Sequence, residues 1–507
     1  MKKIKMLAFF LILALMASAA VSCAKSESGS DSGKPADGDS GNSGGEDSAG
    51  PEQPSENAKL EPDVPAADYG GYEFTILVSV NAVTGAAVWN DFEAEEENGD
   101  VINDAIYKRN AYVEEKYNIQ IKNIEMEAVD GMDRPAAQKL IKNSIAAGDN
   151  TYDASMLAGY ATCNMASGGF LVDMNNMAPL DLSKPWWDQK ANRDLMINNK
   201  MFYTSGDISN VVNEATYAIL FNKKLIKDHG FEQPYDLVRR GEWTYDKLAE
   251  MGAQIGSDLN GDGKMGFDDL YGALVWDDTM MGTVNSIGER CAKINGSGEI
   301  ELTLRSERVL KSFDTYINFV LDKDHAFMYQ REDWGGEKTN AMFENNQGLF
   351  YIQIMELVVR LRAMEVDFGV IPYPKLETSQ ENYYSTVSSW HSGFMCVPVA
   401  QEDISRTGAL LEAMAAESMY TMRPAYYDIA LKGKYIRDEE SEEMLDLIFD
   451  SKIYDLGWLY QIGGYNEEIM NLYRNRKTDF ISMYEKREEK AYKDIAKINE
   501  AFDEILN

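Results

Sequence analysis

Residues 100–124 read DVINDAIYKRNAYVEEKYNIQIKNI, and this stretch indicates how the 507-residue chain folds. In Asp100–Tyr117, Ile102, Ala105, Ile106, Tyr112 and Val113 recur at roughly helical spacing with charged residues between them, which predicts a helix. Asn118–Ile124 (NIQIKNI) then predicts a strand. A helix leading directly into a strand is part of a βα unit, so strands and helices are expected on both sides of it.

The flanking sequence continues this alternation. Tyr72–Val80 (YEFTILVSV) is rich in β-branched and aromatic residues and predicts a buried strand. Ala136–Ala147 predicts a helix that ends at Gly148-Asp149, and Tyr152–Leu157 predicts a third strand. Together these elements predict an α/β fold with a mostly parallel sheet. Further strands are expected at Tyr217–Phe221, Gly348–Gln353, Asp367–Ile371 and Phe394–Val397, and a helical region from about Ser441.

The amino terminus, MKKIKMLAFFLILALMASAAVSC, has three lysines, an apolar run from Met6 to Met16, and then small residues. This pattern is typical of a secretory signal over residues 1–22 and not of a transmembrane helix. With Cys23 directly after the small residues, it resembles a bacterial lipoprotein signal, although Ala20 stands where such signals most often have Leu. The resemblance implies a lipid on Cys23 and anchoring at the extracellular face of the cell membrane. The alternative is ordinary secretion with an incidental cysteine.

Composition limits the remaining possibilities. Residues 23–66 are almost entirely Ser, Gly, Asp, Glu and Pro, which predicts a disordered linker behind the anchor. The rest is too long for one compact core and suggests two lobes. A formal charge of −35 argues against nucleic acid as a partner and against docking on anionic lipid. Cys163, Cys291 and Cys396 form no metal or disulfide pattern; buried free thiols are expected, with one disulfide as the alternative.

Three segments, the first of which overlaps the opening stretch, together carry a family resemblance. They are GDVINDAIYKRNAYVEEKYNIQI near the start of the body, FNKKLIKDHGFEQPYDLVRRGEWTYDKL at residues 221–248, and DFGVIPYPKL at residues 367–376 followed by ENYYSTVSS. The chain resembles the family 1 extracellular solute-binding proteins, the sugar-capturing lipoproteins of ABC importers. The resemblance implies a periplasmic-binding-protein-like (type II) fold of two α/β lobes, with a hinge crossed three times. It also implies a monomer that closes on its ligand and docks on an ABC permease.

Carried onto this chain, the resemblance implies lobe boundaries. Lobe one takes in residues 68–207 and 391–430, and lobe two takes in residues 208–390 and 431–507. The hinge crossings fall near Gly206–Val212, Ser385–Ser392 and Pro424–Lys434.

Residues 258–269, DLNGDGKMGFDD, predict a structural Ca²⁺ site. Asp258, Asn260 and Asp262 occupy alternate positions 1, 3 and 5, and the chain turns at Gly263. The carbonyl of Lys264 and the carboxylate of Asp269 complete a set of oxygen ligands. The last position is Asp where such loops usually have the longer Glu. The alternative is an acidic, glycine-rich turn without a metal.

Candidate ligand contacts follow from the chemistry of sugars, whose flat faces stack on aromatic rings and whose hydroxyls need polar partners. In α/β sheets, ligands bind beyond the carboxyl ends of strands, here at Ser79–Asp91, Leu157–Tyr160 and Ser205–Asn210. The candidates lie at these positions, just before or at the implied hinge crossings, after the Ca²⁺-like loop, or in the Gly-flanked turn REDWGG. They are Trp89, Asp91, Tyr160, Trp187, Asp207, Asn210, Trp276, Trp334, Trp390 and His391. Any single Trp is more often a core residue, and Trp243, just before the expected N-cap Thr244, is expected to be structural.

The sequence favours a binding protein over an enzyme. No GxSxG, HExxH or P-loop pattern occurs, and the chain has only three histidines. With 84 acidic residues, a pair of carboxylates carries little information about glycoside hydrolysis. The first hypothesis is a lipid-anchored protein that delivers a carbohydrate, in first place an oligosaccharide, to an ABC importer. The alternatives are a secreted glycan-degrading enzyme and a solute sensor that feeds a signalling receptor.

Overall fold

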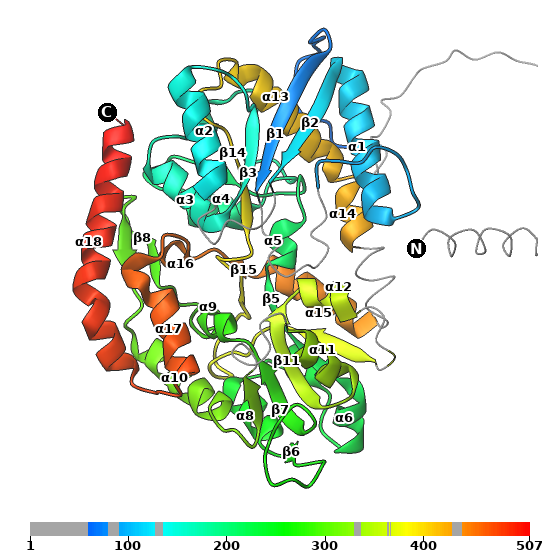
Figure 1. Ribbon diagram of the computed structural model, residues 1–507, viewed down its shortest axis with the longest axis vertical. Helices are drawn as coiled ribbons and strands as arrows, with labels where there is room; N and C mark the ends of the chain where they lie inside the picture. The colour runs from blue at the N-terminus through cyan, green and yellow to red at the C-terminus, as the bar shows by residue number, and fades with distance from the viewer. Residues whose placement is uncertain are drawn as a thin grey trace, which may run out of the picture. The chain divides into compact units, whose positions relative to one another are not determined.

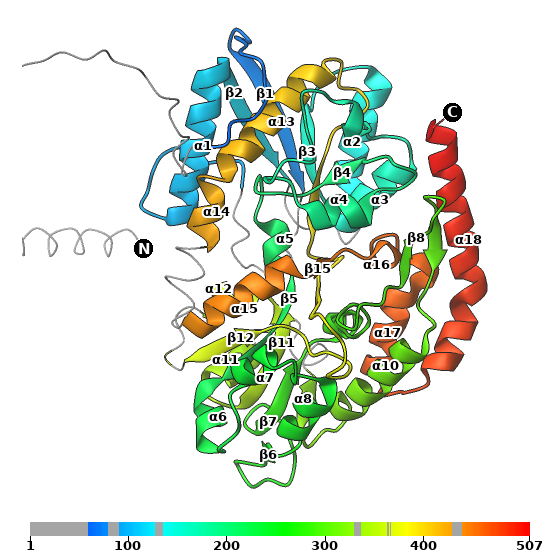
Figure 2. The same ribbon diagram turned by 180° about the vertical axis from the view of Figure 1, so that it is seen from behind.

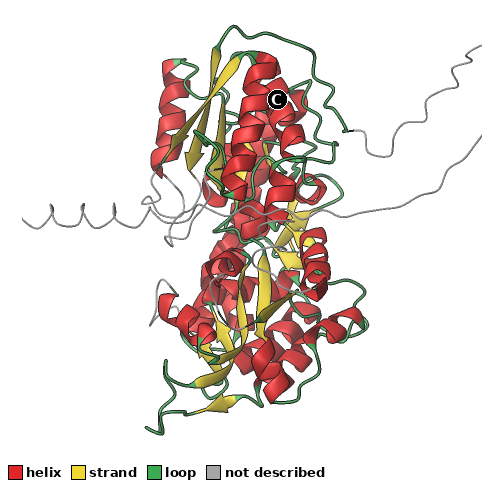
Figure 3. Cartoon of the chain, turned by 90° about the vertical axis from the view of Figure 1, so that its right-hand side faces the viewer, coloured by secondary structure: helices red, strands yellow, loops and turns green. Residues whose placement is uncertain are grey.

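The computed structural model of the chain describes residues 59–79, 91–126, 135–328, 336–361, 365, 367–427 and 439–506. Residues 60–507 form one compact unit, whose described part contains two large β-sheets with helices around each (Figure 1) and two short two-stranded sheets. We call the part built on the first sheet lobe one and the part built on the second sheet lobe two. Seen from the side, helices lie on both faces of each sheet (Figure 3).

The sheet of lobe one has the strand order β2-β1-β3-β14-β4. Its strands are β1 (Tyr72–Ser79), β2 (Ile119–Glu125), β3 (Ala154–Ala158), β4 (Tyr203–Thr204) and β14 (Gly393–Cys396). β1 pairs in parallel with both β2 and β3, whereas β14 is antiparallel to β3 and β4. The expected β-α-β-α-β alternation at the start of the body is confirmed, and β14 is the strand that interrupts the parallel arrangement.

The sheet of lobe two has the order β10-β7-β11-β5-β12, with the short β6 (Gly256–Ser257) beside β7. Its strands are β5 (Tyr217–Asn222), β7 (Leu270–Val275), β10 (Ala326–Met328), β11 (Gly348–Ile354) and β12 (Phe368–Ile371). Here β5 is antiparallel to β11 and β12. In each lobe, therefore, the antiparallel strand is the first one that the chain forms after it arrives from the other lobe.

Local sequence explains the opening elements well. Asp100 caps helix α1 (Val101–Tyr117), because its side chain accepts hydrogen bonds from the N–H groups of Ile102 and Asn103. The helix ends at Asn118, which adopts the left-handed conformation that Asn tolerates. All five residues of β3 and all six of β5 are buried, which is why these strands read as continuous apolar runs.

Helices link successive strands of each lobe and lie on the faces of the sheets. α1 packs beside α13, and α2 beside α3 (Figure 1). Besides α1, their bounds are α2 (Pro135–Ala147), α3 (Gly159–Ser167), α4 (Gln189–Leu195), α5 (Val211–Glu214), α6 (Lys223–Asp228), α7 (Pro234–Arg239), α8 (Tyr245–Gly252), α9 (Gly282–Asn285), α10 (Glu307–Val320), α11 (Glu337–Glu344), α12 (Glu356–Arg360), α13 (Ile404–Ser418), α14 (Met422–Pro424), α15 (Glu439–Asp450), α16 (Leu456–Leu459), α17 (Tyr465–Arg474) and α18 (Phe480–Leu506).

Two connections between the lobes lie in the described residues. The first runs from β4 through α5 to β5, and the second leads from β12 through β13 (Ser385–Thr386) to β14. The third expected crossing, near Pro424–Lys434, falls largely on residues 428–438, which lie outside the described part. The first two run side by side, because Thr216 bridges to Val387. β13 also pairs with β15 (Lys452–Ile453), which Figure 2 shows at the junction of the two lobes.

The carboxyl-terminal segment, residues 456–506, contacts both lobes. Phe480, at the start of α18, packs on Phe313 of α10 in lobe two, with ring centroids 5.1 Å apart. Phe502, near its end, packs on Phe202 of lobe one at 5.4 Å. Figures 1 and 2 show α18 running alongside both lobes. The lobe assignment implied by the family resemblance places residues 431–507 in lobe two, and that boundary stays a prediction.

Two simpler expectations concern cysteines and membrane spans. Cys163, Cys291 and Cys396 are buried free thiols, as expected. Across the described ranges, no helix has the length and apolarity to cross a bilayer. The expected signal, the Cys23 lipidation site and the linker up to residue 58 lie outside the described residues.

Candidate functional site

Four of the expected ligand contacts lie together where strand ends of the two lobes approach each other. Tyr160 follows β3, Trp276 follows β7, and Trp390 and His391 directly precede β14. The rings of Trp276 and His391 meet edge to face with centroids 5.3 Å apart, and those of Tyr160 and Trp390 do so at 6.4 Å. We call these four side chains the aromatic group. It combines residues of lobe one, lobe two and the second connection.

Exposure distinguishes the roles of these rings. Trp276, Trp390 and His391 are partly exposed, so their faces and edges can contact a ligand. Tyr160 is only 2% exposed. Its hydroxyl lies 3.2 Å from Ser389 Oγ and accepts a hydrogen bond from Asn466 Nδ2 at 3.0 Å. Tyr160 therefore supports the neighbouring Trp390 ring and presents little surface of its own.

Behind Trp276 lies a buried acidic pair. Asp277 is fully buried and forms an ion pair with Arg474, which also binds Glu467 at 2.7 Å. Asp278 accepts hydrogen bonds from the hydroxyls of Tyr217 and Ser388 and so joins the first two connections between the lobes. Burial raises the pKa of Asp277 to about 7 and that of Asp278 to about 6.

Asp91 and Asn210 are brought together away from the aromatic group. Asp91 Oδ2 accepts hydrogen bonds from Ser209 Oγ at 2.6 Å and from the backbone N–H of Asn210 at 2.8 Å. The Asp91 carbonyl also accepts from the buried Arg109 at 2.6 Å. Burial raises the pKa of Asp91. Its carboxylate is fully engaged by donors of the protein, and these hydrogen bonds tie lobe one to the first connection.

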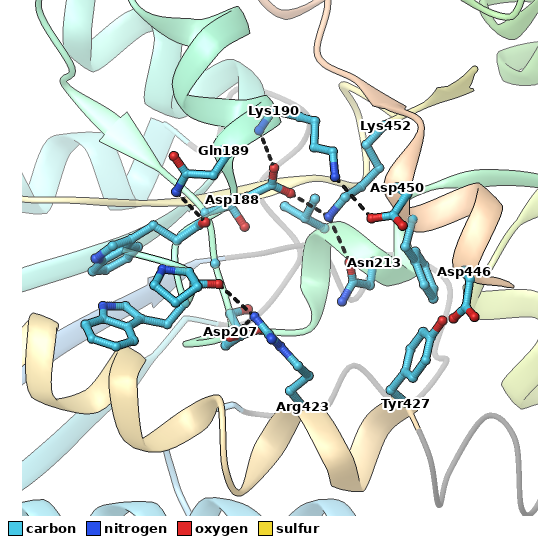
Figure 4. A pocket seen from close by; sticks show the side chains of 18 residues that line it. Asp188, Gln189, Lys190, Asp207, Asn213, Arg423, Tyr427, Asp446, Asp450 and Lys452 are labelled. Carbon is cyan, nitrogen blue, oxygen red and sulfur yellow. Dashed lines mark hydrogen bonds and ion pairs between the residues drawn. The ribbon is translucent and has the colours of Figure 1, made fainter. Parts of the chain in front are cut away.

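Trp187 and Asp207 line a different part of the molecule, a cavity of about 420 Å³ (Figure 4). Trp187 is 2% exposed, and its indole N–H donates to Glu412 Oε2 at 2.8 Å, so the ring belongs to the core. Asp207 pairs with Arg423 of α14, with Nε 2.7 Å from Oδ1. Burial raises the pKa of Asp207 to about 6 despite this guanidinium.

The charged groups of the cavity pair across the junction of the lobes. Lys452 Nζ lies 2.6 Å from Asp188 Oδ2, and Lys190 Nζ lies 3.2 Å from Asp450 Oδ1. Burial alone raises the pKa of Asp188, but the ammonium group of Lys452 outweighs it and lowers that pKa to about 2. Figure 4 shows these charged ends directed at one another. These ion pairs make the lining of the cavity a polar contact between the lobes.

The remaining expected residues lie elsewhere. Trp89 and Trp334 fall outside the described residues. In the Ca²⁺-like loop, both Asp258 oxygens accept backbone N–H groups, from Gly261 at 2.6 Å and Gly263 at 2.7 Å. Within the described residues, no three His, Cys, Asp or Glu side chains are grouped so that they could hold a metal ion. The carbonyl of Lys264 and the side chains of Asp258, Asn260, Asp262 and Asp269 stay predicted ligands.

Sequence reasoning missed the residues that support the aromatic group. Asn466 and Arg474 lie on α17, and Tyr217 starts β5; none belongs to a motif with recognisable spacing. Ser388 and Ser389 stand directly before Trp390 in the quoted segment ENYYSTVSS, so their proximity to the implied hinge was the one available signal. By contrast, Trp243 is buried and Thr244 caps α8, as expected.

Comparison with solved structures shows the fold. A search of curated protein sequences finds no match. The GacH receptor of Streptomyces glaucescens, solved with acarbose, is 12% identical, with a TM-score of 0.51 over 86% of this chain and 98% of that one. A Listeria monocytogenes ABC substrate-binding protein in complex with cycloalternan is 15% identical, with a TM-score of 0.51 over 85% and 99%. The galacto-N-biose-/lacto-N-biose I-binding protein of Bifidobacterium longum is 10% identical, with a TM-score of 0.53 over 87% and 98%.

A family model gives the assignment at sequence level. The model for bacterial extracellular solute-binding proteins matches residues 93–354, which is just over half of the chain. The match begins in the loop before α1. It continues through lobe one and the first connection into lobe two, and it ends with β11. Together with the two-lobed α/β fold, it shows that the chain belongs to the bacterial extracellular solute-binding protein family.

Proposed function

We propose that this protein captures a carbohydrate, an oligosaccharide in the first instance, outside the cytoplasm and delivers it to an ABC importer. The observation that carries the proposal is the aromatic group, in which two partly exposed Trp rings and a His lie where the lobes meet. Partly exposed aromatic rings suit the flat faces of sugars. Other proteins of similar fold were solved with acarbose, cycloalternan and lacto-N-biose.

Two Trp platforms carried by different elements favour a ligand longer than one sugar ring. Trp276 extends from lobe two, and Trp390 belongs to the connection that enters lobe one. A ligand in contact with both stabilises the arrangement in which the two platforms face it together. Hinge closure follows from this differential affinity, because a ligand shifts a conformational equilibrium only as far as it prefers one state. The closed form, acting as a monomer, then docks on the permease.

The test is thermal unfolding and calorimetry of soluble protein from residue 24 onward, with acarbose, cycloalternan and lacto-N-biose as first probes and a wider glycan panel behind them. At 100 times its Kd, a ligand adds about 2.7 kcal/mol to the unfolding free energy. We expect one bound sugar per chain, recovered chemically unchanged. Cleavage of the sugar supports a glycan-degrading enzyme instead, and no response to any glycan removes the carbohydrate proposal.

We also propose that the mature chain is held at the outer membrane surface by a lipid on Cys23. The support is the order of lysines, apolar run and small residues before this cysteine. The acidic, glycine-rich residues 24–66 then serve as a spacer.

A gene deletion distinguishes transport from signalling. If the protein binds a sugar and its deletion abolishes uptake of that sugar, delivery to a permease is supported. If uptake stays intact and a transcriptional response to the sugar is lost, a sensor is supported.

For the loop at residues 258–269 we propose a structural Ca²⁺ ion. The support is the spacing of Asp258, Asn260 and Asp262 before a glycine with φ of 77°, which allows the sharp turn that such loops need. The loop links β6 to β7, so an ion there stabilises lobe two away from the aromatic group.

A further inference from the structure

Helix α17 is anchored on lobe two directly behind one platform of the aromatic group. Tyr473 donates its hydroxyl hydrogen to the carbonyl of Val275 at 3.2 Å, and Arg474 forms the ion pair with Asp277. Val275 and Asp277 flank Trp276 in the chain. The position of α17 is therefore tied to the end of β7.

The first turn of the same helix reaches lobe one. Asn466 Nδ2 donates a hydrogen bond to Tyr160 Oη at 3.0 Å, and Tyr160 stands at the start of α3. The Asn466 side chain is 4% exposed and that of Tyr160 2% exposed. A buried bond of this kind is stronger than one in water and costly to leave unmade. It joins an element fixed to lobe two with an element of lobe one.

Tyr160 in turn holds the other platform. Its ring meets the Trp390 ring edge to face, with an interplanar angle of 83°. Its hydroxyl also lies beside Ser389 Oγ, the neighbour of Trp390 in the chain. The ring of Tyr160 thus contacts Trp390, and its hydroxyl contacts Ser389, shortly before β14 begins at Gly393.

We propose that Asn466 is a positioning residue of the ligand site, which sets the orientation of Trp390 through Tyr160 when the two lobes stand in the arrangement seen here. The inference rests on the proposed function, because Trp390 is taken as a ligand contact. Asn466 itself touches no ligand. Its role is to make the orientation of one platform depend on the position of the opposite lobe.

Hydrogen-bond geometry explains the sensitivity. At 3.0 Å the contact is near its optimum, and beyond about 3.5 Å it is lost. A displacement of one lobe by about an ångström is enough to release the Tyr160 hydroxyl. Trp390 then loses its oriented support, so the site is preorganised only in this arrangement. Preorganisation raises affinity because less order has to be created on binding.

The rest of the carboxyl-terminal segment stabilises the same arrangement and offers a control. Asn499 of α18 hydrogen-bonds the backbone of Ile300 in β9 (Ile300–Leu302), accepting from its N–H at 3.0 Å and donating to its carbonyl at 3.1 Å. This amide belongs to the same segment as Asn466 but has no contact with Tyr160 or Trp390 among the hydrogen bonds of the described residues. Replacing Asn499 therefore removes stabilising contacts of this segment and leaves the proposed support of Trp390 in place.

The first experiment is a double-mutant cycle with Asn466→Ala and Tyr160→Phe, read by calorimetry with acarbose, cycloalternan or lacto-N-biose. Tyr160→Phe keeps the ring that packs on Trp390 and removes the hydroxyl. We expect each single change to weaken binding about tenfold and the double change to be no worse than about threefold beyond either, since both remove one interaction. Asn499→Ala should lower the unfolding temperature and leave Kd unchanged. Additive losses, or an unchanged Kd for Asn466→Ala, overturn the proposal.

A second readout does not depend on any sugar. Spin labels at Lys139 of α2 and Lys227 of α6, both exposed, report the separation of the lobes, and the three buried thiols stay unlabelled. In the unliganded protein we expect Asn466→Ala to broaden this distance distribution and Asn499→Ala to leave it as in the wild type. If no glycan binds but the distribution broadens, the proposed function fails while the interlobe role of Asn466 stands. If sugars bind and neither Kd nor the distribution responds, the inference fails by itself.

Discussion

Replacement of Trp390 by Ala tests the site most directly, because its expected effects on binding and on folding differ in size. The ring is partly exposed, and in the structure its edge-to-face contact is with Tyr160. A sugar that covers about a third of the 150–250 Å² of a Trp side chain, at about 25 cal/mol per Å², contributes about 1–2 kcal/mol. We therefore expect a 5- to 30-fold increase in Kd, approximately. The lost ring contact costs stability by about 0.5–1.5 kcal/mol.

Trp243→Ala is the matched control. Trp243 is fully buried, its indole N–H donates to the carbonyl of Pro372 at 3.0 Å, and its ring packs on Phe350. Removing a buried Trp costs about 3–5 kcal/mol of unfolding free energy. Calorimetry with the sugar identified from the panel gives Kd, and urea unfolding of the same samples gives stability. If Trp390→Ala loses as much stability as Trp243→Ala, or keeps its affinity, Trp390 is a core residue and the reasoning is refuted.

Three further predictions concern protons, calcium and the anchor. Burial raises the folded-state pKa of Asp278 from 3.8 to about 6, so its contribution to stability is fully present below about pH 4 and is lost as pH rises through 6; Asp278→Asn should flatten the fall in unfolding free energy between pH 4 and 7, and an unchanged pH profile would contradict this. Calcium at 100 times its Kd should add about 2.7 kcal/mol to the unfolding free energy, and Asp258→Ala with Asp262→Ala should abolish that gain; a wild-type protein that neither gains stability nor holds calcium by elemental analysis rules out the metal. In the native host, Cys23→Ser should release the protein from the membrane fraction into the medium, and retention on the membrane would show that the lipid on Cys23 is not the anchor.

Local patterns were sufficient for much of the framework. The elements from β1 to β3 begin and end within two residues of their predicted bounds, because each is specified by its own apolar spacing and by caps such as Asp100. The buried state of Trp243 followed from the cap at Thr244. The position of β14 between β3 and β4 could not be predicted in this way, since pairing partners far apart in the chain leave no mark on local periodicity.

For the candidate site, the sequence supplied residue types and the tertiary structure decided which of them meet. Tyr160, Trp276, Trp390 and His391 were chosen because they follow a predicted strand, follow the Ca²⁺-like loop or stand at the implied hinge, and they lie together. Asp91, Asn210, Trp187 and Asp207 were chosen on the same grounds, yet their side chains are engaged by partners such as Ser209, Glu412 and Arg423. Strand order and lobe contacts decide between these outcomes, and neither can be read from spacing.

What the sequence determined by itself was the secondary structure at the start of the body, several later strands, the family and the kinds of side chain at the strand ends, because these depend on periodicity and on short motifs. Only the tertiary structure showed that residues 456–506 contact both lobes, and that Asn466 meets Tyr160 across 306 positions of sequence. The physical reason is that such contacts form when separate elements are buried together. Their partners are selected by the shape and polarity of the whole fold and not by the residues next to them in the chain.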